Sequence, residues 1–178
     1  MKKNIYTTAS IFLIILVLFS RIIPHAPNFT PLISIVLVSS LLFKGKRYFA
    51  LPLIGLFLSD ILLESFYFNG YIFSSIFFWT YASLAFVFIF SFKFNNGLNI
   101  KNVLFHSFSG PLIFFIVSNF GVWIMGGYSY TIMGFITCYT AAIPFFKNTL
   151  SSTLIYSAIL FAPALYKKYT IAVKQIHS

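Results

Sequence analysis

The sequence predicts an all-α integral membrane protein with six transmembrane helices, on the strength of its composition, its hydropathy and its charge distribution. Of its 178 residues, 60% are hydrophobic and only 8% are charged, and the mean hydropathy is +0.94. Soluble domains are ordinarily about 45–50% apolar and about 25% charged. Because a spanning helix needs about 20 residues, six of them fill most of the chain. We therefore expect a single transmembrane domain over residues 1–178, with no soluble catalytic domain.

Six apolar runs mark the expected helices. They cover residues 5–19, 32–43, 48–66, 71–92, 103–125 and 149–166. No small-residue cleavage site follows the first run, so we interpret it as a retained helix and not as a secretory signal. The second run is short for a span. Residues 131–146 are apolar but interrupted by Gly134 and Pro144, and are expected to form a lid or re-entrant segment.

The basic residues predict the orientation of these helices. With six spans, both termini lie on one side, and ten of the twelve Lys and Arg residues fall there. They are Lys2, Lys3, Lys44, Lys46, Arg47, Lys93, Lys101, Lys167, Lys168 and Lys174. Only Arg21 and Lys147 fall on the opposite side. Basic residues collect in cytoplasmic loops, so the pattern predicts cytoplasmic termini in the inner (plasma) membrane. It also accounts for the net charge of +10 without a nucleic-acid partner.

The connection after the first run is rich in proline and carries three unusual polar residues. Its Pro24, Pro27 and Pro31 exclude a continuous helix, because each removes a backbone donor and restricts the preceding residue. Irregular backbone at membrane depth is tolerated where protein buries it or where it lines a wet cavity. The stretch is therefore either a plain rigid connector or part of a site that uses Arg21, His25 and Asn28.

Both carboxylates of the chain, Asp60 and Glu64, lie near the outer end of the third run. Their i, i+4 spacing places them on one helix face. Acidic residues inside a bilayer are costly and usually face a cavity or a partner. The two predictions left open are pairing with Arg21 or Lys147, the two cations on that side, and a direct role in binding a ligand.

Further polar groups fall on the same outer side. Asn119 and Trp123 are four residues apart near the end of the fifth run, followed by a turn at Gly126-Gly127-Tyr128. Trp123 belongs either to the binding site or to the aromatic residues that anchor a helix at the membrane interface. Asn119 is less easily explained in this way, because a buried amide needs a hydrogen-bond partner. Cys138 is either a small packing residue or a ligand. His106 and His177 fall on the cytoplasmic side, away from this group.

Aromatic walls with a few convergent polar groups are typical of a small-molecule pocket. The sequence therefore predicts an outward pocket beneath the proline-rich loops, with no catalytic residue, resident metal or cofactor. The predicted substrate-binding residues are Arg21, His25, Asn28, Asp60, Glu64, Asn119, Trp123, Cys138, Lys147 and Asn148.

Several of these segments carry a resemblance. The patterns Pro24-His25-x-Pro27-Asn28-Phe29-Thr30-Pro31, Asn119-Phe-Gly-Val-Trp123 and Cys138-Tyr-x-Ala-Ala-Ile-Pro-Phe-Phe-x-Asn148-Thr-Leu resemble a bacterial membrane family of unknown function whose members are usually labelled transport proteins. That family looks like the S components of energy-coupling factor (vitamin uptake) transporters. The resemblance implies an S-component-like bundle and an ATP-driven energising module as partner.

One departure from the S-component pattern is informative. Such proteins usually dock through an Ala-x-x-x-Ala stripe on the first helix, and Thr8-Ala-Ser-Ile-Phe-Leu-Ile-Ile has none. A solitary carrier of the kind known for cobalamin therefore stays open. In that case His25 or Cys138 is a candidate cobalt ligand.

The favoured hypothesis is a membrane transporter that binds a small nutrient, vitamin-like or metal-containing. Arg21, His25 and Lys147 would bind an anionic group of it. The chain has no phosphate-binding loop, since Gly45-Lys46 lacks both the upstream glycine and the following Ser or Thr. The alternatives are a small membrane enzyme with His25 as general base beside Asp60 or Glu64, and a structural membrane subunit.

Overall fold

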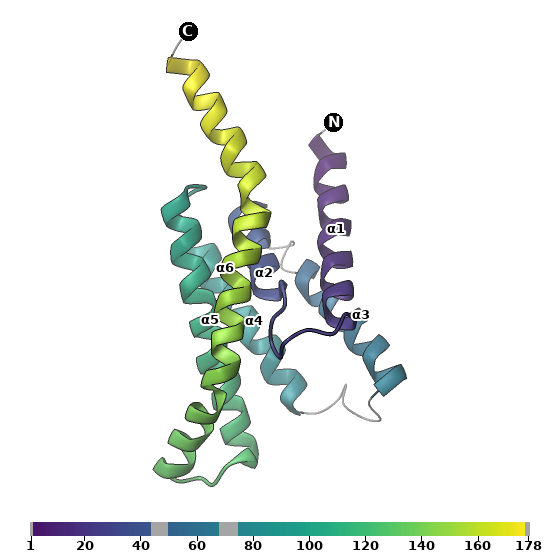
Figure 1. Ribbon diagram of the computed structural model, residues 1–178, viewed down its shortest axis with the longest axis vertical. Coiled ribbons are helices and arrows are strands. Elements are labelled where there is room, and N and C mark those ends of the chain that lie inside the picture. Colours follow the sequence, from purple (N-terminus) through teal and green to yellow (C-terminus); the bar gives the residue numbers. More distant parts are fainter. Residues whose placement is uncertain (1, 44–49, 68–74, 177–178) are drawn as a thin grey trace.

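The computed structural model describes residues 2–43, 50–67 and 75–176, and all regular structure in these ranges is helical (Figure 1). A short π-helical turn, Trp123–Gly127, extends the fifth helix. The helices are α1 (Lys2–Ile22), α2 (Leu32–Leu41), α3 (Ala50–Tyr67), α4 (Ser75–Lys93), α5 (Ile100–Val122) and α6 (Ile132–Ile176). Each of the six predicted apolar runs overlaps one of these helices, although the sixth run covers only the middle of α6.

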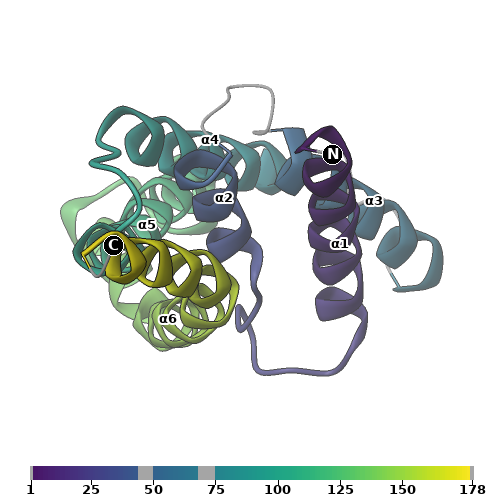
Figure 2. The same ribbon diagram turned by 90° about the horizontal axis from the view of Figure 1, so that it is seen from above.

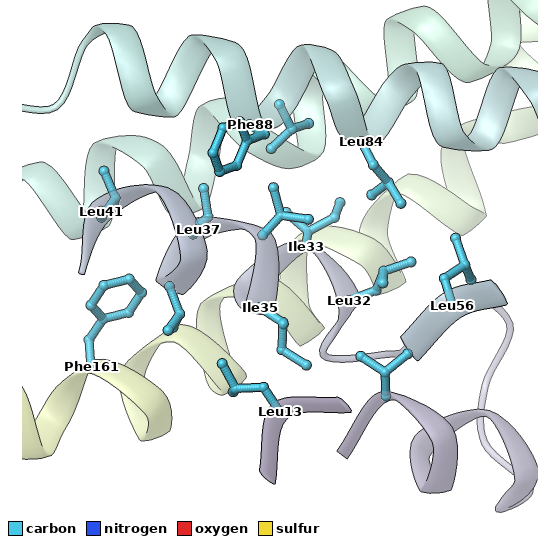
Figure 3. Close-up of a cluster of buried hydrophobic side chains, with 14 of the residues drawn as sticks. Leu13, Leu32, Ile33, Ile35, Leu37, Leu41, Leu56, Leu84, Phe88 and Phe161 are labelled. Carbon is cyan, nitrogen blue, oxygen red and sulfur yellow. The ribbon is translucent and has the colours of Figure 1, made fainter. Parts of the chain in front are cut away.

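Helix α2 forms the centre of the structure, and every one of its ten residues is buried. Its side chains contact α4 on one side and α1, α3 and α6 on the others, as Leu84, Leu13 and Phe161 show in Figure 3. At 1.5 Å per residue, ten residues span about 15 Å, half of a bilayer core of about 30 Å. Alone, α2 is thus too short for the full span predicted over residues 32–43.

Polar contacts fix both ends of α2. Ser34, in its first turn, donates to the Thr153 carbonyl of α6 at 3.0 Å and accepts from the Ser157 hydroxyl at 3.2 Å. At the other end, the Asn95 amide donates to the Leu41 carbonyl at 3.3 Å. These bonds satisfy groups that would be costly to bury unpaired, and they join α2 to α6 and to the loop after α4.

The remaining helices form two groups around this centre. Helix α1 packs mainly on α3, whereas α5 packs on both α4 and α6, and all three pack on α2. Seen from above, the α1–α3 pair lies to one side of the other four helices (Figure 2). The N-terminal end of α1 and the C-terminal end of α6 lie at the same end of the structure (Figure 1).

Much of the outer surface is apolar. Two helical segments, Ile100–Gly127 and Ile132–Ala172, are long and apolar enough to cross a membrane, and only 17% and 28% of their most apolar windows are buried within the described structure. A core helix of a soluble protein is mostly buried, so these helices show the opposite pattern. Isoleucine and phenylalanine are exposed along α1, α3 and α4 as well. Large exposed apolar surfaces mark contact with a membrane or with another protein.

The prediction of a separate lid over residues 131–146 is wrong. These residues form the first third of α6, which continues without a break through Pro144 and Pro163. Thr131 begins the helix, because its hydroxyl accepts from the Gly134 amide at 3.0 Å. Contacts with α5 hold this part of α6 in place, including the 2.7 Å bond from the Tyr139 hydroxyl to the Ile116 carbonyl.

Candidate functional site

A cavity of about 590 Å³ lies between the α1–α3 pair and the other four helices. All six helices and the proline-rich connector contribute to its wall. The lining residues are Arg21, His25, Asn28, Thr30, Leu32, Ile33, Leu56, Leu63, Thr80, Pro111, Phe114, Phe115, Ser118, Asn119, Val122, Ala142, Phe145, Phe146 and Thr149. The volume falls within the range usual for small-molecule sites. The convergence of Arg21, His25, Asn28 and Asn119 on one space is the geometry that the sequence predicted.

Arg21 is the charged residue in this wall, and a buried carboxylate neutralises it. Its guanidinium bonds one oxygen of Asp60 at 2.8 Å. The other oxygen accepts from the Tyr81 hydroxyl at 3.0 Å. The Asp60 side chain is 5% exposed, whereas that of Arg21 is 23% exposed. The pairing predicted between the acidic and basic residues of the outer side is therefore confirmed for Arg21 and Asp60, and it joins α1, α3 and α4.

The connector between α1 and α2 lines the cavity, and hydrogen bonds fix its conformation and its position against α6. The His25 ring bonds the Ile23 carbonyl at 2.6 Å through Nδ1, which must carry the proton because a carbonyl only accepts. Asn28 adopts a left-handed φ of 62°, a conformation that asparagine tolerates better than most residues. The Asn148 amide of α6 donates to the Pro27 carbonyl at 2.9 Å. Asn148 thus positions the connector and is not part of the lining.

Helices α5 and α6 form the wall opposite Arg21. The amide nitrogen of Asn119 donates to the Phe115 carbonyl of its own helix at 2.8 Å. The hydroxyls of Ser118 and Thr149 donate in the same way to Phe114 and Phe145, at 2.7 and 2.9 Å. Phenylalanine rings surround these polar groups.

Two predicted site residues lie elsewhere. Trp123 is in an aromatic cluster with Phe120, Tyr130 and Phe135, and its indole nitrogen donates to the Ser129 carbonyl in the turn after α5 at 3.1 Å. Cys138 is buried, and its thiol faces the Asn119 carbonyl at 3.4 Å. Both side chains join α5 to α6 at the end of the hairpin. The interpretation of Cys138 as a packing residue is the one that its geometry favours.

Of the remaining predicted residues, Lys147 does not line the cavity, and the side chain of Glu64 is not described. Lys147 is exposed on α6 and forms no ion pair with a described side chain. Glu64 belongs to α3, but its side chain lies outside the described residues, as does His177. Within the described structure, no group of three or more His, Cys, Asp and Glu side chains is arranged to hold a metal ion.

The sequence prediction missed several cavity residues. Thr30, Phe145, Phe146 and Thr149 belong to the same motifs as Asn28 and Asn148, so motif membership was a usable signal for them. Tyr81 gave no signal, because it is one of 11 tyrosines in an apolar helix. Its role depends on α4 lying beside α3, which only the tertiary structure determines.

A second polar cluster lies at the far end of the helices. The Asn102 amide donates to the Gly97 carbonyl at 2.9 Å and to the Asn95 side-chain oxygen at 3.3 Å. His106 is fully buried beside the Phe94 carbonyl, and its Nδ1 has no partner among the described residues. As predicted, His106 is remote from the outer group. The cluster organises the loop after α4 and is distinct from the cavity.

The fold and this site define a helical bundle with a cavity among its helices that is lined by both apolar and polar side chains. The chain belongs to the family of unknown function DUF6580, whose sequence profile matches residues 1–173. No curated protein and no solved structure matches the chain significantly. The predicted relationship to transporter S components therefore stays a prediction.

Proposed function

We propose that this protein is a multi-pass inner-membrane transporter that binds a small nutrient in the cavity among its helices. The observation that supports this function best is the cavity itself. All six helices contribute to it, and Arg21, fixed by Asp60, supplies a positioned charged group in a wall of apolar and uncharged polar side chains. A concave, mostly apolar site with a few placed polar groups is the usual form of a small-molecule binding site.

The proposed topology has six crossings with both termini in the cytoplasm. In this arrangement, α2 and the non-helical connector together make the second crossing, since α2 is only ten residues long. The N-terminal end of α1 and the C-terminal end of α6 lie at one end of the structure, as an even number of crossings requires (Figure 1). Basic residues concentrate in the loops assigned to that end. The connector and the cavity then belong to the outer half.

Energy for uptake must come from outside this chain, because the sequence has no phosphate-binding loop. An ATP-driven module is the partner that the S-component likeness implies. The Ala-x-x-x-Ala stripe used for that docking is absent from α1, so we propose a carrier whose docking differs from the usual pattern or that acts alone. Its further partners in this proposal are the lipid bilayer and the small molecule.

The geometry favours binding over catalysis. His25 was the candidate general base beside Asp60 or Glu64, but the Asp60 carboxylate is bonded by Arg21 and Tyr81. The described contact of the His25 ring is with the Ile23 carbonyl, so a His25–Asp60 pair is not among the contacts of the described residues. A structural membrane subunit remains the other alternative, and it requires no ligand in the cavity.

The first experiment identifies the small molecules that co-purify with the protein. We expect mass spectrometry to find one compound enriched with the wild type and absent from Ala142→Phe, because Ala142 lines the cavity and a phenyl ring there fills it. Ala158→Phe is the matched control, since Ala158 is exposed on the same helix away from the cavity. Ser118→Phe fills the cavity from α5 and serves if Ala142→Phe does not fold.

Two outcomes would overturn the proposed function. One is a purified wild-type protein with no enriched small molecule that also fails to accumulate any nutrient in cells that express it. The other is a compound retained equally by both cavity-filling variants, which would place its binding elsewhere. Monodisperse elution in detergent would show that each variant is folded.

A further inference from the structure

The hydrogen-bonding pattern of the cavity wall points to the chemical class of its ligand, an inference that rests on the proposed function. On α5 and α6, the polar hydrogens of Ser118 and Thr149 are directed to backbone carbonyls of their own helices. An Asn119 amide hydrogen is used in the same way. The groups that remain available to a ligand are mainly hydrogen-bond acceptors, namely the hydroxyl lone pairs and the side-chain oxygen of Asn119. This wall is therefore suited to a ligand that donates hydrogen bonds.

Two other parts of the wall offer donors. A guanidinium has five N–H groups, and the contact with Asp60 leaves others of Arg21 for a ligand. Leu32 and Ile33 line the cavity at the start of α2, where no side chain caps the helix. The first amide groups of a helix have no intrahelical acceptor. A ligand carbonyl oxygen fits these positions, so the cavity matches a molecule that carries both hydrogen-bond acceptors and donors.

The charge balance of the cavity disfavours an anionic ligand. Arg21 is the formally charged residue of the lining, and the Asp60 carboxylate already compensates it at 2.8 Å. A ligand carboxylate bound at Arg21 would be close to Asp60, and like charges are costly in a low-dielectric site. Lys147, which was expected to help bind an anion, is not part of the lining. A cation would in turn meet Arg21.

Aromatic rings bound the site on the same wall as the acceptors. The rings of Phe115 and Phe146, from α5 and α6, contact each other with centroids 5.0 Å apart, and both residues line the cavity. Phe114 and Phe145 line it beside them. Aromatic faces favour a planar ring in offset or edge contact. We propose that the cavity binds an uncharged, planar ring compound that carries amide-type N–H and C=O groups.

Three probes of similar size test this proposal on the purified full chain in detergent. Quinazoline-2,4-dione is uncharged and has both N–H and C=O groups. Its 1,3-dimethyl derivative keeps the ring and the carbonyls but has no N–H donor, and quinoline-4-carboxylate carries a negative charge. We expect calorimetry to show the tightest binding for the dione and about tenfold or weaker binding for the dimethyl derivative, which leaves wall acceptors unpaired.

Matched variants locate the effect. Thr149→Val keeps the side-chain shape and removes an acceptor of the wall, and we expect it to weaken binding of the dione. Thr170→Val is the control, because Thr170 makes the same bond to its own helix, 2.9 Å to the Tyr166 carbonyl, away from the cavity. Asn119→Leu and Asn96→Leu form a second pair, since Asn96 is exposed in the loop after α4.

The ligand class would be overturned by equal binding of the dione and its dimethyl derivative, by tighter binding of the carboxylate, or by no binding of any probe. Equal loss of affinity in Thr149→Val and Thr170→Val would overturn it too. These outcomes are distinct from failure of the proposed function. If the carboxylate binds best and Ala142→Phe abolishes its binding, the cavity remains a binding site and only the ligand class is wrong.

Discussion

The interaction of Arg21, Asp60 and Tyr81 shows how one buried carboxylate organises the cavity. Arg21 comes from the end of α1, and Asp60 and Tyr81 come from α3 and α4. Removing one partner of a buried ion pair is costly because the other charge is left uncompensated. Asp60 therefore acts as a positioning residue, which directs Arg21 toward the cavity and lowers the net charge there.

A graded set of substitutions tests this role. We expect Tyr81→Phe to lower the stability in detergent by about 1–2 kcal/mol, because a bond to a charged group is lost. Asp60→Asn should lower it further, since it also removes the counter-charge of Arg21. Tyr156→Phe is the control, because no described hydrogen bond uses the Tyr156 hydroxyl. The measurement is the melting temperature from intrinsic fluorescence. Equal melting temperatures for Tyr81→Phe and Tyr156→Phe would contradict this order.

Asn119 and Trp123 show the limit of spacing arguments for single residues. Residues four apart lie on one side of a helix, yet only Asn119 lines the cavity. A tryptophan side chain is long, and the Trp123 indole extends to the Ser129 carbonyl and to the rings around it. The hydrogen bond to Ser129 fixes the position of the Trp123 indole, and Ser129 belongs to a turn six residues further along the chain.

At the scale of elements, α2 and α6 depart most from the prediction. Helix α2 is half the length of a span because Pro31 precedes it and the connector is not helical. Helix α6 continues through Pro144, although proline removes one backbone bond and usually kinks a helix. Neighbouring helices compensate for such a loss, and α5 lies along this part of α6.

Close packing of α4 on α5 provides a test at this scale. Gly121 lies against Trp79, and a Cβ there would come within 2.2 Å of the indole ring. We expect Gly121→Ala to destabilise the protein by about 1–3 kcal/mol, the usual cost of overpacking. Gly110→Ala should cost less, because its Cβ would meet the side chain of Ile33 at 3.2 Å.

The two glycine variants are compared by thermal unfolding in the same detergent. Both substitutions raise helix propensity equally, by up to about 1 kcal/mol, so the difference between them reports the contact with Trp79. A Gly121→Ala protein as stable as Gly110→Ala would contradict the close approach of α4 and α5.

At the scale of the whole molecule, the arrangement predicts the orientation in the membrane. The turn after α5 and the loop after α4 lie at opposite ends of α5. We expect alkaline phosphatase fused after Tyr130 to be active, because the enzyme requires export, and a fusion after Asn96 to be inactive. A cytoplasmic fluorescent protein should give the reverse pattern. Equal activity at both positions, or the opposite order, would contradict the proposed topology.

The sequence by itself determined the positions of the six apolar runs and the non-helical connector, and it limited the expected cationic partners of the two carboxylates to Arg21 and Lys147. These features depend on local hydropathy, on proline, and on the scarcity of charges in an apolar chain. Only the tertiary structure decided which side chains share the cavity. Helix α2 is apolar on every side, so no periodicity indicated its neighbours. The rotation and depth of each helix follow from packing between segments distant in the chain, which brought Tyr81 to Asp60 and left Trp123 and Cys138 outside the lining.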